Sequence, residues 1–491
     1  MKSFDVFDTL IARKCIQPQA IFSLVEQRMG IRGFAAVRVE AERQLQGSEY
    51  SLDEIYLKIV ANSGITDDLA ARAKHAELTA ELENVIPIEE NLRRVSDGDV
   101  LITDIYLPLS FVSALLQRAG LRKKCSIIRS ADGKATGRAW DSLRRAKAEV
   151  VHLGDNPHSD VEMPRRYGFA AMLTNVSRPS AVEQYLLARG LTGTALIART
   201  LRLGLPHDVS VAHELQQCQA GINVPLLLLA SLYLGNFLRG QRHSYDSILF
   251  SSRDCRGWQK IFHALYGGKE DQAPRIEYFF TSRLSRVSAS PAYLRYFSGL
   301  LGRRTLVVDL CGTGLSLASL LRRAQADASI FLLHHVTHEA VNAFYRQSYD
   351  VSLQGVDIHF VLDDSQHLSN LPLELLNYAS HPMVLDMDEI EGSPSVFAPR
   401  FATSEFSQEQ IQWIESMEAA VDAVLPLLSD PLLRLQLESQ DAMKPQGLIR
   451  EALIHLGREA AQARAPMSAF GDTHRLADDL VYSSLASVRR Q

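Results

Sequence analysis

The sequence predicts an α/β protein made of two Rossmann-like domains, a helical connector and a helical C-terminal region. Short apolar runs alternate with helical segments over residues 1–178 and again over 243–400. This alternation is typical of parallel sheets with crossover helices. The 491 residues, divided by about 150 per domain, allow roughly three domain-equivalents, and 46% apolar with 22% charged residues is ordinary for a globular protein.

The first domain begins with an apolar strand candidate at residues 3–7, which leads into Asp8 and Thr9. A helix-rich stretch follows, and Ser51 with Glu54 forms a capping box at the start of one of its helices. The helical block, about residues 14–97, is therefore expected as an insertion after the first strand. Further strand candidates lie at 100–103, 125–129, 150–153 and 170–174.

Residues 179–242 have a helical pattern and are predicted to connect the two domains. The second α/β domain, residues 243–400, has strand candidates at 247–250, 276–280, 305–308, 330–333 and 358–362. Residues 401–491 are predicted to be helical, with Ser407 and Gln410 as a candidate capping box.

Charge and cysteine content exclude several classes of protein. The chain has 52 Lys and Arg against 57 Asp and Glu, so a nucleic-acid partner is not expected. Its five scattered cysteines form no CxxC pair, which argues against a zinc site or a disulfide framework. The N-terminus lacks a signal-peptide layout, and the apolar stretch 224–238 is shorter than the roughly 20 residues that span a bilayer. We expect a cytoplasmic protein in which this stretch is a buried helix.

Residues with chemical potential follow four strand candidates of the first domain. They are Asp5, Asp8, Thr103, Lys134, Asp155 and Asp160. Open α/β sheets place their sites at such strand ends. The set supplies a nucleophilic carboxylate, a hydroxyl, a cation and a second carboxylate cluster, as phosphoryl transfer through an aspartyl-phosphate requires. A divalent metal is expected as well, because phosphate and carboxylates would otherwise repel each other.

This order and spacing resemble the haloacid dehalogenase superfamily, most of whose members are phosphatases, over residues 1–178. The resemblance implies that Asp5 is the nucleophile, that Thr103 binds the phosphate, and that Lys134 neutralises the phosphoaspartate. It implies Mg²⁺ as the cofactor and assigns the metal site to Asp5, Phe7, Asp155 and Asp160. The helical insertion corresponds to the cap of that superfamily.

One position departs from the superfamily pattern. Its phosphatases place the general acid/base two residues after the nucleophile, where this chain has Phe7. Haloacid dehalogenases also have an aromatic residue there, but they usually carry a small residue in place of Asp8. Asp8 takes the acid/base role if the strand end bends to present it. A phosphatase is favoured, with a dehalogenase and an altered or inactive site as the alternatives.

A glycine-rich turn follows the strand candidate 305–308 of the second domain. Asp309 ends this strand, and the turn contains Gly312, Thr313, Gly314 and Ser316. Converging backbone amides at a helix N-terminus make a phosphate cradle. The spacing resembles the phosphoribosyl-pyrophosphate loop of phosphoribosyltransferases, where an acid holds the ribose hydroxyls and the turn holds the 5-phosphate. That family usually has two adjacent acids, whereas this chain has Val308 first; a plain glycine-rich turn is the alternative.

Two other strand ends of this domain carry serine and arginine side chains, which suit pyrophosphate binding. One supplies Ser252, Arg253 and Asp254, and the other supplies Ser282, Arg283 and Arg286. Chance surface loops are the alternative reading. Asp254 is a candidate for binding Mg²⁺ or for accepting the proton of the acceptor. The acidic cluster 386–389 is a weaker candidate for the same roles and is expected as a solvated turn.

The whole chain resembles the dual-domain ribofuranosyltransferases of bacterial surface polysaccharide (O-antigen or capsule) synthesis. The SFDVFDTL start, the SSRD segment and the DLCGTGLS loop carry this resemblance. It implies transfer of 5-phosphoribose from phosphoribosyl pyrophosphate to a lipid-linked glycan acceptor, with release of pyrophosphate, followed by hydrolysis of the 5-phosphate. It also implies peripheral contact with the inner face of the plasma membrane or with other polysaccharide-assembly enzymes.

Three alternatives remain open at this stage. The chain is a nucleobase phosphoribosyltransferase with a fused nucleotidase, a phosphatase whose second half only binds a partner, or a non-enzymatic scaffold in polysaccharide assembly. Pyrophosphate release with a glycan acceptor separates the ribofuranosyltransferase from all three.

Overall fold

The computed structural model describes residues 1–147, 149–206, 208, 210–241, 245–268, 273–337, 352–390 and 396–475. The chain forms two compact units. The first comprises Met1–Ser180 with Arg202–His207, and the second comprises Ala181–Leu201 with Asp208–Gln491. The predicted α/β class is confirmed, because each unit contains a sheet of five parallel strands.

The sheet of the first unit has the strand order β5-β4-β1-β6-β7. Its strands are β1 (Lys2–Phe4), β4 (Val100–Asp104), β5 (Ser126–Ser130), β6 (Val151–Gly154) and β7 (Ala170–Leu173). All five predicted strands are present. The central strand β1 ends at Phe4 rather than at Phe7, so Asp5 is the first residue beyond its carboxyl end. Strands β4 and β6 pair with β1 in parallel, so their carboxyl ends lie at the same edge of the sheet.

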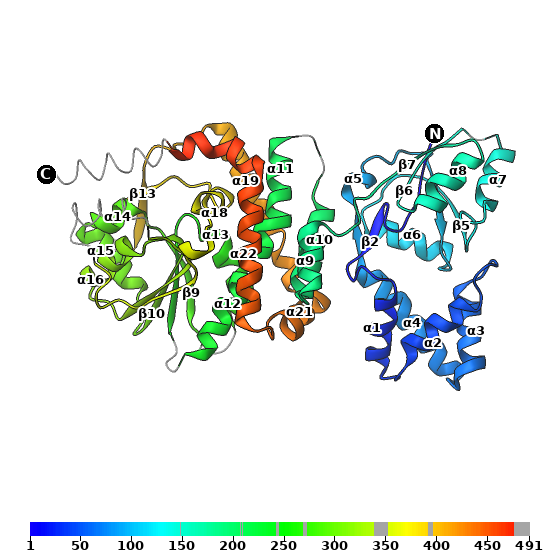
Figure 1. Ribbon diagram of the computed structural model, residues 1–491, viewed down its shortest axis with the longest axis horizontal. Helices are drawn as coiled ribbons and strands as arrows, with labels where there is room; N and C mark the ends of the chain where they lie inside the picture. The colour runs from blue at the N-terminus through cyan, green and yellow to red at the C-terminus, as the bar shows by residue number, and fades with distance from the viewer. Residues whose placement is uncertain are drawn as a thin grey trace. The chain divides into compact units, whose positions relative to one another are not determined.

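Four helices follow β1 and form the predicted helical insertion. They are α1 (Gln19–Met29), α2 (Phe34–Arg43), α3 (Leu52–Ser63) and α4 (Asp67–Asn84), which pack on one another and lie together beside the sheet of their unit (Figure 1). The predicted capping box of Ser51 and Glu54 starts α3. At the base of the insertion, β2 (Ile11–Arg13) pairs antiparallel with β3 (Val85–Pro87), so the chain enters and leaves the helices at one place.

The sheet of the second unit has the order β12-β11-β10-β8-β9. Its strands are β8 (Ser247–Ser251), β9 (Arg275–Phe279), β10 (Thr305–Gly312), β11 (Ala328–His335) and β12 (Ile358–Leu362). The five predicted strands are therefore present here too. In this order β10 is the central strand, β8 lies next to it and β9 is the edge strand, so the three predicted phosphate-binding segments emerge from adjacent strands.

The turn after β10 is shorter than the sequence suggested. The prediction that the strand ends at Asp309 is wrong, because β10 pairs with β11 as far as Gly312. Helix α16 (Leu315–Arg323) begins directly after Gly314, which is its N-cap. Thr313 and Gly314 alone separate strand from helix. Asp309 is thus a residue within the strand, and Ser316 lies in the first turn of α16.

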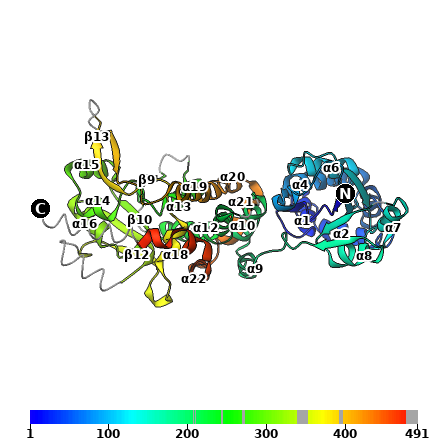
Figure 2. The ribbon, with the colours of Figure 1, turned by 90° about the horizontal axis from the view of Figure 1, so that it is seen from above.

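The predicted connector helices belong mostly to the second unit. These are α9 (Ala181–Ala188), α10 (Thr192–Gly204), α11 (Val211–Cys218) and α12 (Val224–Gly240). Helix α12 packs against α13 (Arg256–Tyr266) and against α22 (Gln446–Gln462), and it lies beside α22 in both views (Figures 1 and 2). As predicted, its apolar residues are buried.

One helical run of the described residues is long and apolar enough to cross a membrane by length and composition. This run, Val211–Gly240, has 30 residues and a mean hydropathy of 1.6 in its most apolar window. About two thirds of that window, 67%, is buried inside the protein, as in the core helix of a globular unit.

The acidic cluster 386–389 is not the expected turn. It lies in β13 (Val384–Glu389), which pairs antiparallel with β14 (Phe397–Phe401). Asp386 accepts hydrogen bonds from Ser290 at 2.7 Å and from Arg400 at 3.0 Å. Arg400 lies on the paired strand β14, and its positive charge offsets the charge of the Asp386 carboxylate. Beyond the hairpin, the predicted capping box of Ser407 and Gln410 starts α19 (Gln408–Asp422).

Candidate active sites

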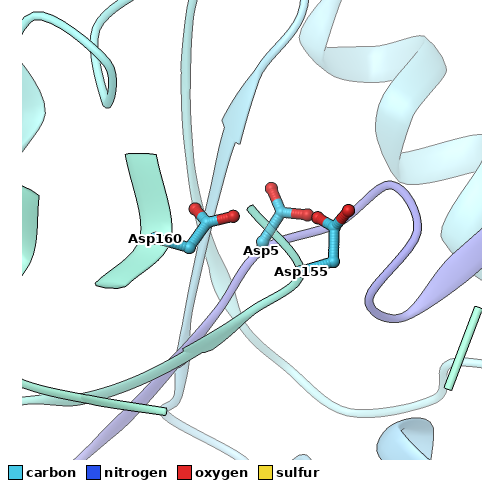
Figure 3. A group of neighbouring side chains, drawn as sticks. All are labelled: Asp5, Asp155 and Asp160. Carbon is cyan, nitrogen blue, oxygen red and sulfur yellow. The ribbon is translucent and has the colours of Figure 1, made fainter. Parts of the chain in front are cut away.

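Three carboxylates meet at the carboxyl edge of the first sheet. Asp5 follows β1, Asp155 follows β6, and Asp160 lies in the π-helical turn Pro157–Glu162 (Figure 3). One ligand oxygen of each lies within 4.8 Å of the others, and Asp5 and Asp160 are buried. Gly154 allows this close approach, since a Cβ there would lie 2.4 Å from Cγ of Asp160.

The Lys134 ammonium lies between two members of this acidic triad. It donates to Oδ1 of Asp160 at 2.6 Å and to Oδ1 of Asp5, although Lys134 is only 3% exposed. Asp160 is held further by His152 at 3.3 Å and by the backbone N–H of Asn156 at 3.0 Å. Both oxygens of Asp160 are therefore engaged within the protein, which suits a supporting role at a metal site.

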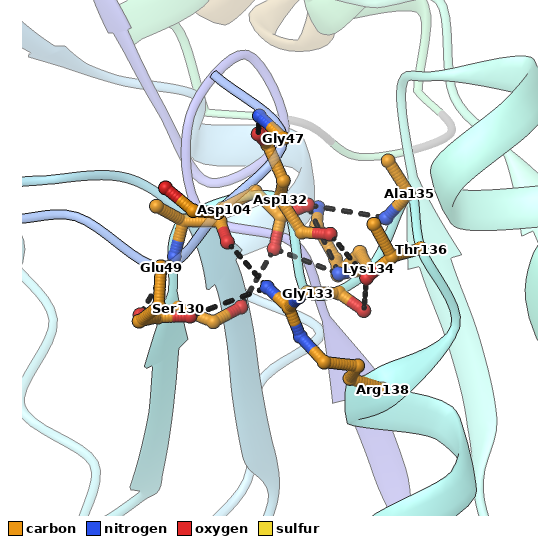
Figure 4. Close-up of polar contacts among 12 residues, drawn as sticks. Gly47, Glu49, Asp104, Ser130, Asp132, Gly133, Lys134, Ala135, Thr136 and Arg138 are labelled. Atoms are coloured by element: carbon orange, nitrogen blue, oxygen red, sulfur yellow. Dashed lines mark hydrogen bonds and ion pairs between the residues drawn. The ribbon is translucent and has the colours of Figure 1, made fainter. Parts of the chain in front are cut away.

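The loop that carries Lys134 is fastened to the sheet by Asp104. Its carboxylate accepts hydrogen bonds from the backbone N–H of Lys134 at 2.9 Å, from that of Ala135 at 3.2 Å and from the Ser130 hydroxyl at 2.9 Å (Figure 4). From the helical insertion, Glu49 accepts the N–H of Ala131 at 3.0 Å. No local pattern in the chain indicates these roles, because each depends on contacts between distant segments.

Burial and neighbouring charge set the protonation of the triad. Burial raises the pKa of Asp5 to about 8. The positive charge of Lys134 opposes this rise, and the negative charges of Asp160 and Asp155 add to it. Burial, followed by the charges of Asp8 and Asp160, raises the pKa of Asp155 to about 6. For Asp160, burial favours the neutral acid, but the His152 hydrogen bond and the Lys134 charge bring its pKa down to about 2.

His152 is neutral in this arrangement, because its burial lowers its pKa. A carboxylate only accepts hydrogen bonds, so the proton of the ring lies on Nε2, which faces Asp160. The other nitrogen, Nδ1, then accepts from the Ser3 hydroxyl at 2.9 Å. His152 thus fixes the orientation of Asp160 without adding a charge.

The chain forms a turn between Asp5 and β2, and Asp8 lies in this turn. Asp8 has a positive φ of 58°, and its N–H donates to the carbonyl of Ile11 at 2.6 Å. Its charge acts on Asp155. The Phe7 ring instead packs under the Arg13 guanidinium at 4.5 Å. A phenyl ring offers no metal ligand, so Phe7 could contribute only its carbonyl oxygen. Thr103, 1% exposed, lies at the end of β4.

The acidic triad fits a divalent metal ion by its chemistry. Buried carboxylate oxygens are the ligands that hard cations such as Mg²⁺ prefer. Without a metal ion, the three carboxyl groups lie close together, and the Lys134 ammonium pairs with Asp5 and Asp160. Within the part of the chain that the structure describes, this is the one group of three or more acidic, histidine or cysteine side chains close enough to hold an ion.

Two adjoining cavities lie at the carboxyl edge of the second sheet. The first, about 420 Å³, is lined by Asp309, Gly312, Thr313, Gly314 and Ser316 among others. The second, about 350 Å³, is lined by Ser252, Arg253, Asp254 and Ser282 among others. The structure therefore brings together the residues predicted at the ends of β8, β9 and β10, whereas the acidic cluster 386–389 lines neither cavity. Arg283, Arg286 and Asp309 line both cavities.

Hydrogen bonds fix the segments that line these cavities. Arg286 donates from Nη1 to Asp309 at 3.1 Å and to the Ser316 hydroxyl at 3.4 Å, and from Nε to Thr281 at 3.1 Å. Ser252 donates to the carbonyl of Thr281 at 2.6 Å, which joins the ends of β8 and β9. One arginine thus links the end of β9 to β10 and α16.

Backbone conformation and packing both favour glycine at position 314. Gly314 has a positive φ of 75°, and a Cβ on it would lie 2.9 Å from Cδ1 of Ile358, which is a packing contact. Gly312, with φ of 147°, has open space where a Cβ would be.

Two residues predicted for the second cavity, Arg253 and Asp254, have charged or aromatic neighbours. Arg253 pairs with Glu405, and its guanidinium lies 5.4 Å from the Tyr378 ring and 5.6 Å from the Phe406 ring. Burial, with the charge of Glu374, raises the pKa of Asp254 to about 7. A carboxyl group with this pKa can exchange a proton near neutral pH.

Two residues that the sequence did not single out line both cavities. Glu374 comes from α18 (Asn370–Leu376), and His474 comes from the helical residues 464–475. His474 lies 3.5 Å from Glu374 through Nε2 and 2.5 Å from the Tyr378 hydroxyl through Nδ1. Neither belongs to a local motif, so a sequence pattern could not have found them.

Comparison with known proteins adds no name to these sites. No protein-family model matches the chain. No curated protein sequence matches it at a significant level either.

Proposed function

We propose that the chain is a bifunctional ribofuranosyltransferase of bacterial surface polysaccharide synthesis. The second unit transfers 5-phosphoribose from phosphoribosyl pyrophosphate to a lipid-linked glycan acceptor, and the first unit then removes the 5-phosphate. The observation that carries the proposal is the position of the buried Lys134 between Asp5 and Asp160, beside Asp155. A structural role alone would not require so many buried charges, because burying them costs free energy.

In the first unit, Asp5 attacks the phosphorus atom, and the bond from phosphorus to the ribose oxygen breaks. Asp8 gives its proton to that leaving oxygen and then takes a proton from the water that hydrolyses the aspartyl-phosphate. Lys134 and Thr103 bind the phosphate oxygens. Mg²⁺, held by Asp5 and Asp155 with Asp160 in support, supplies charge neutralisation when bound. The dehalogenase alternative has no role for Asp8, which lies close enough to Asp155 to raise its pKa.

In the second unit, the 5-phosphate of the donor occupies the first cavity, near Thr313 and the N-terminus of α16. The pyrophosphate lies in the second cavity, where Arg253 and Arg283 provide guanidinium groups. The bond from C1 of ribose to pyrophosphate breaks, and a bond to the acceptor oxygen forms. Asp254 accepts the hydroxyl proton of the acceptor. Attack from the face opposite the α-linked leaving group gives a β-ribofuranoside.

The proposal places both reactions in the cytoplasm, at the inner face of the plasma membrane. The alternatives differ in the acceptor. A nucleobase phosphoribosyltransferase with a fused nucleotidase uses the same donor chemistry, and a phosphatase with a non-catalytic second unit releases no pyrophosphate.

The decisive experiment incubates the full chain with phosphoribosyl pyrophosphate, Mg²⁺ and either a lipid-linked glycan fraction or free nucleobases. Pyrophosphate release only with the glycan fraction supports the proposal. Release with nucleobases selects the nucleobase enzyme. If no acceptor yields pyrophosphate while phosphate is still released from a 5-phosphoribosyl compound, the second unit is a binding domain.

A further inference from the structure

The loop between α2 and α3 of the helical insertion contacts the loop that carries Lys134 (Figure 4). The backbone N–H of Gly47 donates to Oδ2 of Asp132 at 2.9 Å. Oε1 of Glu49 accepts from the backbone N–H of Ala131 at 3.0 Å. Both contacts act on the short segment of chain that leads directly to Lys134. The insertion therefore reaches the backbone of the catalytic loop as well as the space beside it.

These contacts hold a different part of the Lys134 loop from the contacts of Asp104. Asp104 binds the Ser130 hydroxyl and the N–H of Lys134, which lie on either side of the segment in question. Asp132, between these two points, has a positive φ of 59°, a conformation that side chains with a Cβ disfavour. Such a conformation persists where neighbouring contacts impose it, and the N–H of Gly47 supplies one of them. The shape of this segment thus depends in part on the insertion.

Two arginines orient the Glu49 carboxylate. Nη2 of Arg129 lies 3.7 Å from Oε1, and Nη2 of Arg138 lies 3.5 Å from Oε2. Because the Glu49 side chain is 49% exposed, these ion pairs contribute little free energy by themselves. Arg138 also donates to the carbonyl of Ala131 at 3.0 Å. Glu49 and Arg138 together therefore fix the peptide groups on both sides of Ala131, which is buried.

The insertion is docked on the sheet through Tyr106. The N–H of Leu52, the first residue of α3, donates to the Tyr106 carbonyl at 3.0 Å. The rings of Tyr50 and Tyr106 stack with their centroids 6.3 Å apart, and the Arg38 guanidinium lies 4.7 Å from the Tyr106 ring. Tyr106 is buried and follows β4 by two residues. The insertion is therefore held next to the strand that carries Thr103.

We propose that Glu49 is a positioning residue for phosphate hydrolysis. Through Ala131 it holds the loop that places the Lys134 ammonium between Asp5 and Asp160, so docking of the insertion and placement of the lysine are coupled. This inference rests on the proposed function of the first unit. Glu49 acts through the backbone of another segment and not on the phosphate itself.

The kinetic test measures phosphate release from ribose 5-phosphate with Mg²⁺ by the full chain. Glu49→Ala should lower kcat about tenfold, the order that a hydrogen bond to a charged group contributes, and should change KM little. Glu49→Gln keeps an oxygen acceptor for the N–H of Ala131 and should recover most of the lost kcat. Glu40→Ala is the matched control, because Glu40 is also 49% exposed and pairs with Arg43 within α2. It should keep the kcat of the wild type.

Hydrogen–deuterium exchange tests the contact without turnover. The amide of Ala131 should exchange faster in Glu49→Ala, because its N–H loses the acceptor, and the peptide that contains Lys134 should follow. Glu40→Ala should exchange as the wild type does. Glu49→Asp withdraws the carboxylate from Ala131 by one methylene group. It should also be slow in the kinetic test, and it replaces Glu49→Ala if that variant folds poorly.

The outcomes separate this inference from the proposed function. If the wild type releases no phosphate, the phosphatase assignment fails, and exchange at Ala131 still decides whether Glu49 holds the loop. If the wild type is active and Glu49→Ala keeps its kcat, Glu49 does not position Lys134. If Glu49→Gln is as slow as Glu49→Ala, the contact with Ala131 is not the cause, and the inference is wrong. Unchanged exchange at Ala131 in Glu49→Ala would contradict it as well.

Discussion

Replacing Asp5 by asparagine should stabilise the metal-free protein while it abolishes phosphate release. Asp5 lies in a buried triad with Asp155 and Asp160, and burial raises its pKa to about 8. In the unfolded chain its pKa is about 3.9. At pH 7 the folded state therefore keeps a proton on Asp5 that the unfolded state has lost, and this difference works against folding.

The size of the effect follows from the same pKa values. The difference between pH 7 and 3.9 is about 3 units, and each unit corresponds to about 1.4 kcal/mol, which gives an upper limit of about 4 kcal/mol. Asparagine removes this cost but also weakens the contact with Lys134, so we expect a gain of about 2 kcal/mol. In a unit of this size, that gain raises the Tm by at least about 4 °C.

The assay is thermal unfolding in EDTA at pH 5.5 and pH 7.5, with Asp53→Asn as the control. Asp53 is an exposed residue of the same unit, with its side chain 72% exposed. The Tm of the wild type should fall as the pH rises from about 4 towards 8. The Tm of Asp5→Asn should fall less, so the difference in Tm between the two proteins should increase with pH. A Tm of Asp5→Asn at or below that of the wild type at pH 7.5 would refute the assignment of Asp5 as a strained, buried carboxyl group.

Three further predictions concern single residues. Asp8→Asn should slow dephosphorylation by ~10²–10⁴-fold, the usual contribution of a general acid/base, and a loss below tenfold in a phosphate-release assay would make Asp8 a turn residue. Asp104→Ala should lower the phosphatase kcat at least tenfold, because the Lys134 loop loses its anchor; unchanged steady-state kinetics would exclude this. For transfer, kcat/KM should rise with pH around 7 as Asp254 loses its proton. A flat pH profile in the wild type, or one that Asp254→Asn leaves unchanged, would remove Asp254 as the base.

The strands and helix caps were predictable because their signals are local. Apolar runs marked all ten strands of the two parallel sheets, and the capping boxes at Ser51 and Ser407 marked helix starts. The residue at which a strand ends was harder to predict, because it depends on how far the neighbouring strand pairs with it. Strand β10 continues past Asp309 to Gly312 since β11 pairs with it there. The acidic cluster 386–389 became a strand because β14 lies opposite it.

The sites were predictable where residues stand at the ends of parallel strands. Parallel pairing brings these ends to one edge, so Asp5 and Asp155 meet although they are distant in the sequence. The residues that orient the sites were not predictable in this way. Asp104 and His152 act through contacts between distant segments, which leave no periodic or motif signal in the chain.

The central claim is that one chain adds phosphoribose and then removes its phosphate. The most direct measurement is mass spectrometry of the lipid-linked glycan after incubation with phosphoribosyl pyrophosphate and Mg²⁺, using the wild type and Asp5→Asn. The wild type should add ribose, and Asp5→Asn should add phosphoribose that accumulates. Addition of plain ribose by a clean Asp5→Asn preparation, or no addition by either protein, would contradict the claim.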